Sequence, residues 1–175
     1  MYVPPAVSLN GKLRAGRYYF ARCQCPPDVL QAFVHRKQYI GQLELLAAVA
    51  AYTTFPDILR GRRVIHWIDN TSALAGLIKG YARAPDSARI VHAFHAFNAG
   101  LQADVRFEYV AFKANIADMP SRGDVSLLRR LNAQERECVL PEVDAWSADA
   151  EFVFNSQFRI GIAGDWLCTS PRPRS

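Results

Sequence analysis

Hydrophobic and polar residues follow two different periods along the chain, and the changes between them mark the expected elements. Residues 11–25 are rich in aromatic side chains and stop at a Pro-Pro pair, which predicts strand material. Residues 28–36 favour a short helical turn. Residues 38–55 carry leucine, valine and alanine around most of a helical surface, so we expect a deeply buried helix. Residues 105–110 alternate apolar and polar side chains, which is typical of a strand with one wet face.

The most informative stretch is residues 64–69, an apolar run that ends in Asp69. Its β-branched and aromatic side chains predict a mostly buried strand. The Asp, Asn, Thr and Ser that follow supply turn and N-cap chemistry for a short helix over residues 73–79, which Gly80 closes. Because open α/β sheets usually bind ligands where a strand ends before a helix, Asp69 is the first candidate for chemistry.

A longer helix follows, and the chain then becomes less regular. Asp86 or Ser87 is expected to cap a helix that runs to Ala99 and stops at Gly100. Residues 126–139 favour a further, peripheral helix.

The order of strands and helices predicts an α/β fold. The chain has 175 residues and is 50% hydrophobic, which suits one globular domain with a real core and a less regular tail. We expect the main domain over residues 1–135 and a partly irregular carboxyl-terminal extension over residues 136–175.

Charge and cysteine content narrow the function classes only slightly. The net charge of +5 is compatible with a polyanionic partner but is too small to establish one. The four cysteines lack zinc-finger spacing, and Cys23 and Cys25 fall on one side of a predicted strand, which favours two reduced thiols. No signal peptide and no stretch long enough to span a bilayer is apparent, so an intracellular location, in cytoplasm or nucleus and without membrane contact, is expected.

Three carboxylates stand at positions that suggest chemistry. Glu44 is the single polar side chain between Leu43 and Tyr52, and an isolated carboxylate there is costly unless a cation compensates it. Asp118 follows a strand at the start of a short helix, as Asp69 does, and Asp124 nearby is a possible substitute. Structural alternatives are a Glu44 at the helix rim paired with an Arg, and an Asp118 that only favours the helix dipole.

Three carboxylates from separate elements suit a divalent cation. Hard oxygen ligands are preferred by Mg²⁺ and Mn²⁺. Two such ions roughly 4 Å apart activate a water and stabilise the leaving oxygen of a phosphodiester.

Three runs of residues together resemble one known family. They are Gln42-Leu43-Glu44-Leu45-Leu46-Ala47, Ile68-Asp69-Asn70-Thr71-Ser72-Ala73 and Asn115-Ile116-Ala117-Asp118-Met119-Pro120-Ser121-Arg122-Gly123. In this order and spacing they look like the ribonuclease H domain of retroelement reverse transcriptases, of the LTR or tyrosine-recombinase type. The resemblance covers roughly residues 12–130. It implies a ribonuclease-H-like fold, a mixed five-stranded sheet with helices on both faces.

The resemblance also implies an activity and its residues. The activity is cleavage of the RNA strand of an RNA/DNA hybrid with two Mg²⁺ (or Mn²⁺) ions. Glu44 matches the helix carboxylate that binds metal and senses the 2′-hydroxyl, Asp69 the strand-end ligand, and Asp118 the last metal-binding acid. Expected contacts to nucleic acid are Asn70, Thr71, Ser72, Lys113 and Asn115.

One departure from the family bears on activity. The family carries its first metal-binding Asp on the opening strand, whereas no Asp or Glu precedes Asp28 here. Either the chain begins downstream of that strand, as a fragment attached to parent polymerase domains would, or the site has decayed. We therefore expect weak or no nuclease activity from this chain alone.

Two other classes of function remain open. One is a catalytically dead ribonuclease-H-like module that binds nucleic acid or connects polymerase domains. The other is an unrelated α/β domain whose acids are helix caps and surface ion pairs.

Overall fold

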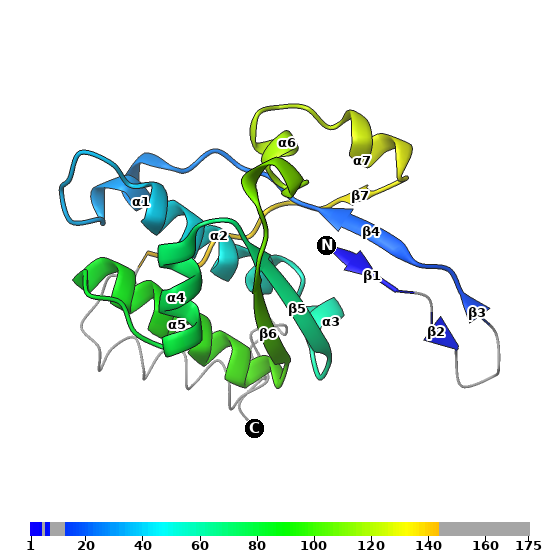
Figure 1. The fold of residues 1–175 in the computed structure, drawn as a ribbon, viewed down its shortest axis with the longest axis horizontal. Coiled ribbons are helices and arrows are strands. Elements are labelled where there is room, and N and C mark those ends of the chain that lie inside the picture. The colour runs from blue at the N-terminus through cyan, green and yellow to red at the C-terminus, as the bar shows by residue number, and fades with distance from the viewer. Residues whose placement is uncertain (5, 8–12, 144–175) are drawn as a thin grey trace, which may run out of the picture. The chain divides into compact units, whose positions relative to one another are not determined.

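The α/β class expected from the sequence is confirmed, because helices and short strands follow one another along the chain (Figure 1). No helix within the described part of the chain is long and apolar enough to cross a membrane. The computed structural model describes residues 1–4, 6–7 and 13–143. Most of the expected extension over residues 136–175, from residue 144 on, lies outside the described residues, as do the first two residues of the predicted strand region that starts at residue 11.

The chain forms two compact units, and the predicted division at residues 135/136 remains a prediction. Unit 1 contains residues 1–24 and 111–138. Unit 2 contains residues 25–110 and the described residues from 139 on. Unit 1 is therefore built from two segments that flank the larger part of unit 2 in sequence.

The sheet of unit 2 is a parallel pair. Strand β5 (Arg63–Ile68) pairs with β6 (Asp104–Tyr109) along its whole length, from Arg63 opposite Asp104 to Ile68 opposite Tyr109. The connection between the strands runs through helices α4 (Thr71–Lys79) and α5 (Pro85–Leu101), as parallel strands require. A βαβ arrangement of this kind presents the carboxyl ends of both strands at one edge.

The prediction that residues 64–69 form a mostly buried strand is half wrong. Successive side chains alternate between faces, and Ile65 and Trp67 are 60% and 57% exposed. Their neighbour His66 points to the other face, where it contacts rings of α2 and α5. The apolar run is thus continuous in sequence, but the helices of unit 2 cover one of its faces.

The core of unit 2 lies between helices α2 (Ile40–Thr54) and α5. The predicted helix over residues 38–55 is confirmed, and its buried side includes Val49 and Tyr52. The Tyr52 ring meets the edge of Phe94 from α5 at 4.7 Å between centroids. Rings packed in this way add to the burial of apolar surface, which is the main favourable contribution to folding.

The predicted end of α4 is confirmed, whereas the predicted start and end of α5 are wrong. Gly80 ends α4 in the left-handed conformation, at φ 66°. Helix α5 passes through Gly100 and ends at Leu101, with Gln102 as its C-cap at φ 54°. The helix is two residues longer than predicted, and the added Leu101 is completely buried. Its N-cap is Ala84, followed by a proline at the first helical position, instead of Asp86 or Ser87.

Unit 1 contains short strands and short helices. Strand β4 (Arg17–Phe20) pairs antiparallel with β1 (Tyr2–Val3) and parallel with β7 (Gln134–Glu135), so the sheet order is β1-β4-β7. A second antiparallel pair joins β2 (Ala6–Val7) to β3 (Leu13–Arg14). The expected five-stranded sheet depends on pairing between strands of the two units and remains a prediction.

The peripheral helix expected over residues 126–139 is much shorter than predicted. Helix α7 (Ser126–Arg130) ends as Asn132 takes a left-handed conformation, at φ 50°, and the Ala133 N–H donates to the Leu128 carbonyl. The chain then extends into β7. The remaining short helices are α1 (Pro27–Gln31), α3 (Pro56–Leu59), η1 (Phe112–Ala114) and α6 (Asp118–Ser121).

Candidate carboxylate site

Asp69 lies where the parallel β5–β6 pair ends. The ladder continues past the strands, because the Val110 N–H donates to the Ile68 carbonyl at 3.0 Å. Asp69 is the next residue, and its side chain is partly buried. The strand-end position expected from the sequence is therefore confirmed.

Asn70 begins helix α4 by capping it. Its side-chain oxygen accepts hydrogen bonds from the backbone N–H groups of Ser72 and Ala73, each at 3.0 Å. Thr71 and Ser72 are exposed in the first turn of the nine-residue helix. A nucleic-acid contact by Asn70 would use its amide N–H groups, because its oxygen already serves the cap.

Glu44 lies on α2 and is partly buried. Its neighbours Leu45 and Leu46 are buried in the core, whereas Ala47 is exposed, so Glu44 lies at the edge of the buried face. Helix α2 also packs against α4, the helix that follows Asp69. Glu44 and Asp69 therefore belong to the same compact unit.

Asp118 is the first residue of α6, in unit 1, as the sequence predicted for an acid at a helix start. Its carboxylate forms an ion pair with the Arg122 guanidinium one turn later, at 2.9 Å between Oδ2 and Nε. Asp124, the possible substitute, accepts a hydrogen bond from the Ser126 N–H, which lowers the pKa of this exposed carboxyl. Asp124 thus stabilises the turn that leads into α7.

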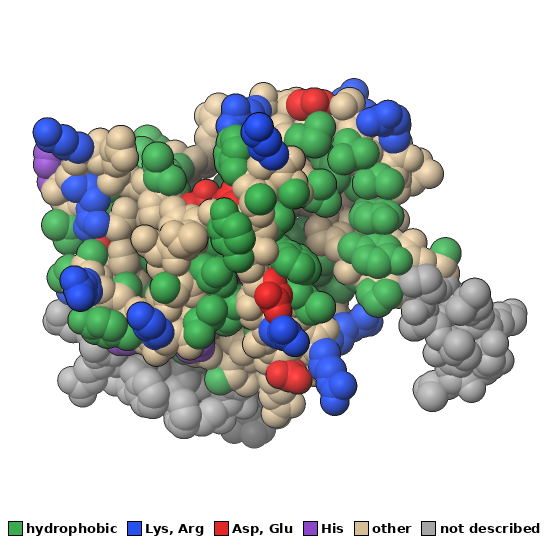
Figure 2. Space-filling view, in the orientation of Figure 1, with side chains coloured by type: hydrophobic (Ala, Val, Ile, Leu, Met, Phe, Trp, Pro, Cys, Tyr) green, Lys and Arg blue, Asp and Glu red, His purple; other side chains and the backbone are tan. Residues whose placement is uncertain are grey.

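The remaining predicted nucleic-acid residues are in the loop before α6. Lys113 is exposed within η1. The Asn115 side-chain oxygen accepts a hydrogen bond from the Ala117 N–H at 3.0 Å and so shapes the turn that leads to Asp118. Exposed Phe112 lies under the Arg122 guanidinium, 5.2 Å from its ring centre. Figure 2 shows apolar and basic side chains mixed on the visible face of the molecule.

The convergence of Glu44, Asp69 and Asp118 on one cation remains a prediction. The first two carboxylates belong to unit 2 and the third to unit 1, so convergence depends on how the units pack. Over the residues that the structure describes, no group of three or more His, Cys, Asp or Glu side chains is arranged to hold a metal ion.

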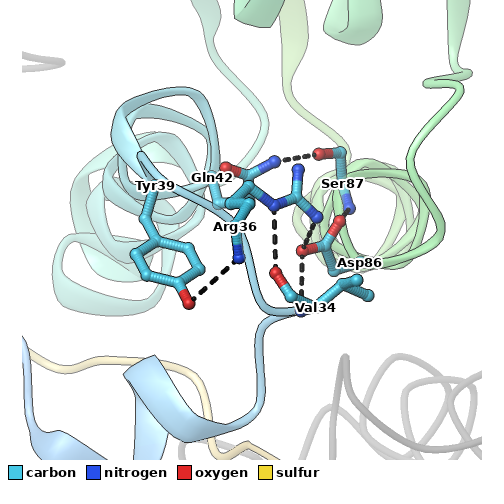
Figure 3. Close-up of polar contacts among 6 residues, drawn as sticks. All are labelled: Val34, Arg36, Tyr39, Gln42, Asp86 and Ser87. Atoms are coloured by element: carbon cyan, nitrogen blue, oxygen red, sulfur yellow. Dashed lines mark hydrogen bonds and ion pairs between the residues drawn. The ribbon is translucent and has the colours of Figure 1, made fainter.

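A buried polar cluster in unit 2 was not anticipated from the sequence (Figure 3). Asp86 is only 2% exposed and accepts hydrogen bonds from the Arg36 guanidinium at 2.5 Å and from the Val34 N–H at 3.1 Å. Next to it, the Gln42 amide donates to the Ser87 hydroxyl at 2.8 Å. The cluster fastens the loop before α2 to the start of α5. Its one sequence signal was the Asp-Ser pair at a helix start, which we interpreted as a cap.

His66 is enclosed by aromatic rings and is not suited to proton transfer at neutral pH. It stacks on Tyr52 and meets Phe94 and Phe107, with ring centroids 5.8–6.4 Å apart. Burial lowers the pKa of His66 to about 4, so the imidazole is neutral above that pH. Burial also raises the pKa of Tyr52, whose hydroxyl lies 3.4 Å from the His66 Nδ1.

Comparison of the chain with protein-family models, with curated proteins and with solved structures gave no match.

Proposed function

We propose that this chain is a ribonuclease-H-like domain of a retroelement reverse transcriptase that acts on the RNA strand of RNA/DNA hybrids. The observation that carries the proposal is the position of Asp69, at the carboxyl end of a parallel strand pair and directly before a capped helix. The partly buried Glu44 in the same unit and the ordered set of three motifs support it.

The three carboxylates fit a divalent cation by donor chemistry. Glu44, Asp69 and Asp118 supply hard oxygen atoms, which Mg²⁺ and Mn²⁺ prefer. Asp118 uses one oxygen in its ion pair with Arg122, which leaves the other for a ligand. Bound ions would activate a water and stabilise the leaving oxygen of the phosphodiester.

The residues around Asp69 suit a phosphate backbone. Thr71 and Ser72 are exposed hydroxyls at the amino end of α4, where the helix dipole favours an anion. Unit 1 separately carries the exposed Lys113, whose positive charge also suits a phosphate. Such contacts position a nucleic acid without reading its sequence.

A second function, binding without cleavage, is favoured by one observation. No Asp or Glu occurs among residues 1–27, so the set has three acids where the resembled family has four. Because one bridging ligand is missing, the affinity for metal ions falls and cleavage is lost. The domain then acts as a nucleic-acid-binding or connecting module.

The test is cleavage of a labelled RNA/DNA hybrid with Mg²⁺ or Mn²⁺, in which Asp69→Asn is compared with the wild type. The matched control is Asp104→Asn, an acid of the same sheet whose side chain is 82% exposed at the start of β6. Cleavage lost in Asp69→Asn and kept in Asp104→Asn supports the nuclease. Hybrid binding without cleavage, weakened by Lys113→Ala, supports the second function. A wild-type chain that neither cleaves nor binds hybrid refutes both.

A further inference from the structure

Two cysteine thiols face each other in unit 1 at the end of the β4–β7 pair. The Sγ atoms of Cys23 and Cys138 lie 3.2 Å apart, and neither residue is in a disulfide. The parallel pair matches Tyr19 with Gln134 and Phe20 with Glu135, a constant offset of 115 positions, and the two cysteines have the same offset. The thiols therefore occupy directly opposite positions on the continuation of the two strands.

Neighbouring contacts hold this register up to the cysteines. Beyond the last strand pair, the Arg136 N–H donates to the Phe20 carbonyl at 2.9 Å. The Arg22 guanidinium then forms an ion pair with Glu135 at 3.0 Å. Adjacent strands are about 4.8 Å apart, which is within the range of Cα separations that a disulfide spans. The two thiols can thus be joined with a small rotation of their side chains.

A disulfide between Cys23 and Cys138 would link the two sequence segments of unit 1. Unit 1 ends at residue 24 in its first segment and at residue 138 in its second. Cys23 and Cys138 are therefore beside two of the three points where the chain passes between the units. A disulfide would hold the end of the first segment covalently to the end of the second segment.

We propose that Cys23 and Cys138 are an oxidation site that forms a reversible disulfide by exchange with a small-molecule disulfide such as glutathione disulfide. Cys23 is exposed, so its thiolate attacks one glutathione sulfur; the glutathione S–S bond breaks and one glutathione thiolate leaves. The Cys138 thiolate then attacks the Cys23 sulfur, and the second glutathione leaves. Both thiol protons end on the two glutathione molecules, so two protein thiols and one disulfide give one protein disulfide and two thiols.

The experiment equilibrates the full chain in glutathione buffers of graded ratio and measures the fraction of protein disulfide by mass spectrometry of digests. The Cys25→Ser/Cys168→Ser variant isolates the proposed pair, and Cys23→Ser/Cys168→Ser is its matched control, which keeps Cys25. The same titration is run in urea. Because a native disulfide stabilises the fold by restricting the unfolded chain, we expect the effective thiol concentration to be about 100-fold higher in the native chain than in urea.

Three outcomes decide the proposal. A Cys23–Cys138 peptide that forms in the native wild type and in the isolating variant, and is reversed by reduced glutathione, supports it. Equal effective concentrations in native and urea-treated chains overturn it, since the fold then does not bring the thiols together. Oxidation that yields instead a Cys25 disulfide, a disulfide-linked dimer or only glutathione adducts also overturns it. Peptide mapping of the wild type gives this answer even if a variant fails to fold.

Discussion

Replacing Asp86 with Ala is expected to destabilise the chain more than any surface change. The substitution removes the acceptor for two groups from another part of unit 2, the Arg36 guanidinium and the Val34 N–H. A partly buried N–H left without a partner costs about 1–3 kcal/mol. Breaking a buried ion pair by deleting one partner costs about 3–5 kcal/mol in all. Because Arg36 keeps 27% of its side-chain surface in solvent, we expect the lower part of this range, about 3 kcal/mol.

The assay is urea unfolding followed by circular dichroism. With a slope near 2 kcal/mol per molar urea, a loss of about 3 kcal/mol lowers the unfolding midpoint by about 1.5 M. Asp104→Ala is the matched control, because that acid is also in an ion pair with an Arg, at 3.8 Å, but its side chain is 82% exposed. Its midpoint should stay close to the wild type, since exposed pairs contribute little.

A double-mutant cycle separates the ion pair from the other contacts. We expect Arg36→Ala and Asp86→Ala together to cost at least 1 kcal/mol less than the sum of the single changes, because the pair is lost only once. An Asp86→Ala midpoint equal to that of Asp104→Ala would refute the reasoning. It would mean that the loop before α2 is not held to α5 by this carboxylate.

The remaining predictions concern pH, helix ends and ligand binding. The pKa of His66 is lowered to about 4 in the folded chain, so between pH 6.5 and 4 the unfolded chain binds a proton that the folded chain does not, and stability falls as pH falls. The expected loss in the free energy of unfolding is about 2 kcal/mol at pH 5. Urea unfolding of His66→Phe should show a flatter dependence of stability on pH. Asn70→Ala removes the cap of α4 and should lower the free energy of unfolding in urea by about 1 kcal/mol; an unchanged midpoint would contradict the cap. Gly80→Ala places a side chain at φ 66° and should cost about 1 kcal/mol, whereas an unchanged midpoint would argue against the left-handed helix end. Lys113→Ala should weaken hybrid binding equally for different sequences and reduce its salt dependence, as measured by fluorescence anisotropy; a sequence-dependent loss would contradict a phosphate contact.

The periodic elements of unit 2 were predictable because local pattern determines them. The leucines and alanines of α2, the alternation in β6 and the glycine after α4 each act within a few residues. The end of α5 was not predictable in this way. Its last turn is stabilised by burial of Leu101, a tertiary effect that outweighs the preference of Gly100 for ending a helix.

The position of each candidate site residue within its helix or strand was predictable from the sequence, but the arrangement of these residues in space was not. Asp69 at a strand end and Asp118 at a helix start follow from local sequence, and both positions are confirmed. Their distance from Glu44 depends on tertiary packing, which no local pattern encodes. The same limit explains why Asp86 was interpreted as a cap: its partner Arg36 is 50 positions away.

The layout of unit 1 has a consequence for the order of events during synthesis. Strand β4 leaves the ribosome before β7, the strand that completes its second edge, because β7 follows 115 residues later in the chain. At about 5–20 residues per second, β4 waits roughly 6 to 23 seconds with that edge open to other chains. Unit 2 has time to fold in this interval, so the translation speed across residues 25–110 should control how often the nascent protein aggregates.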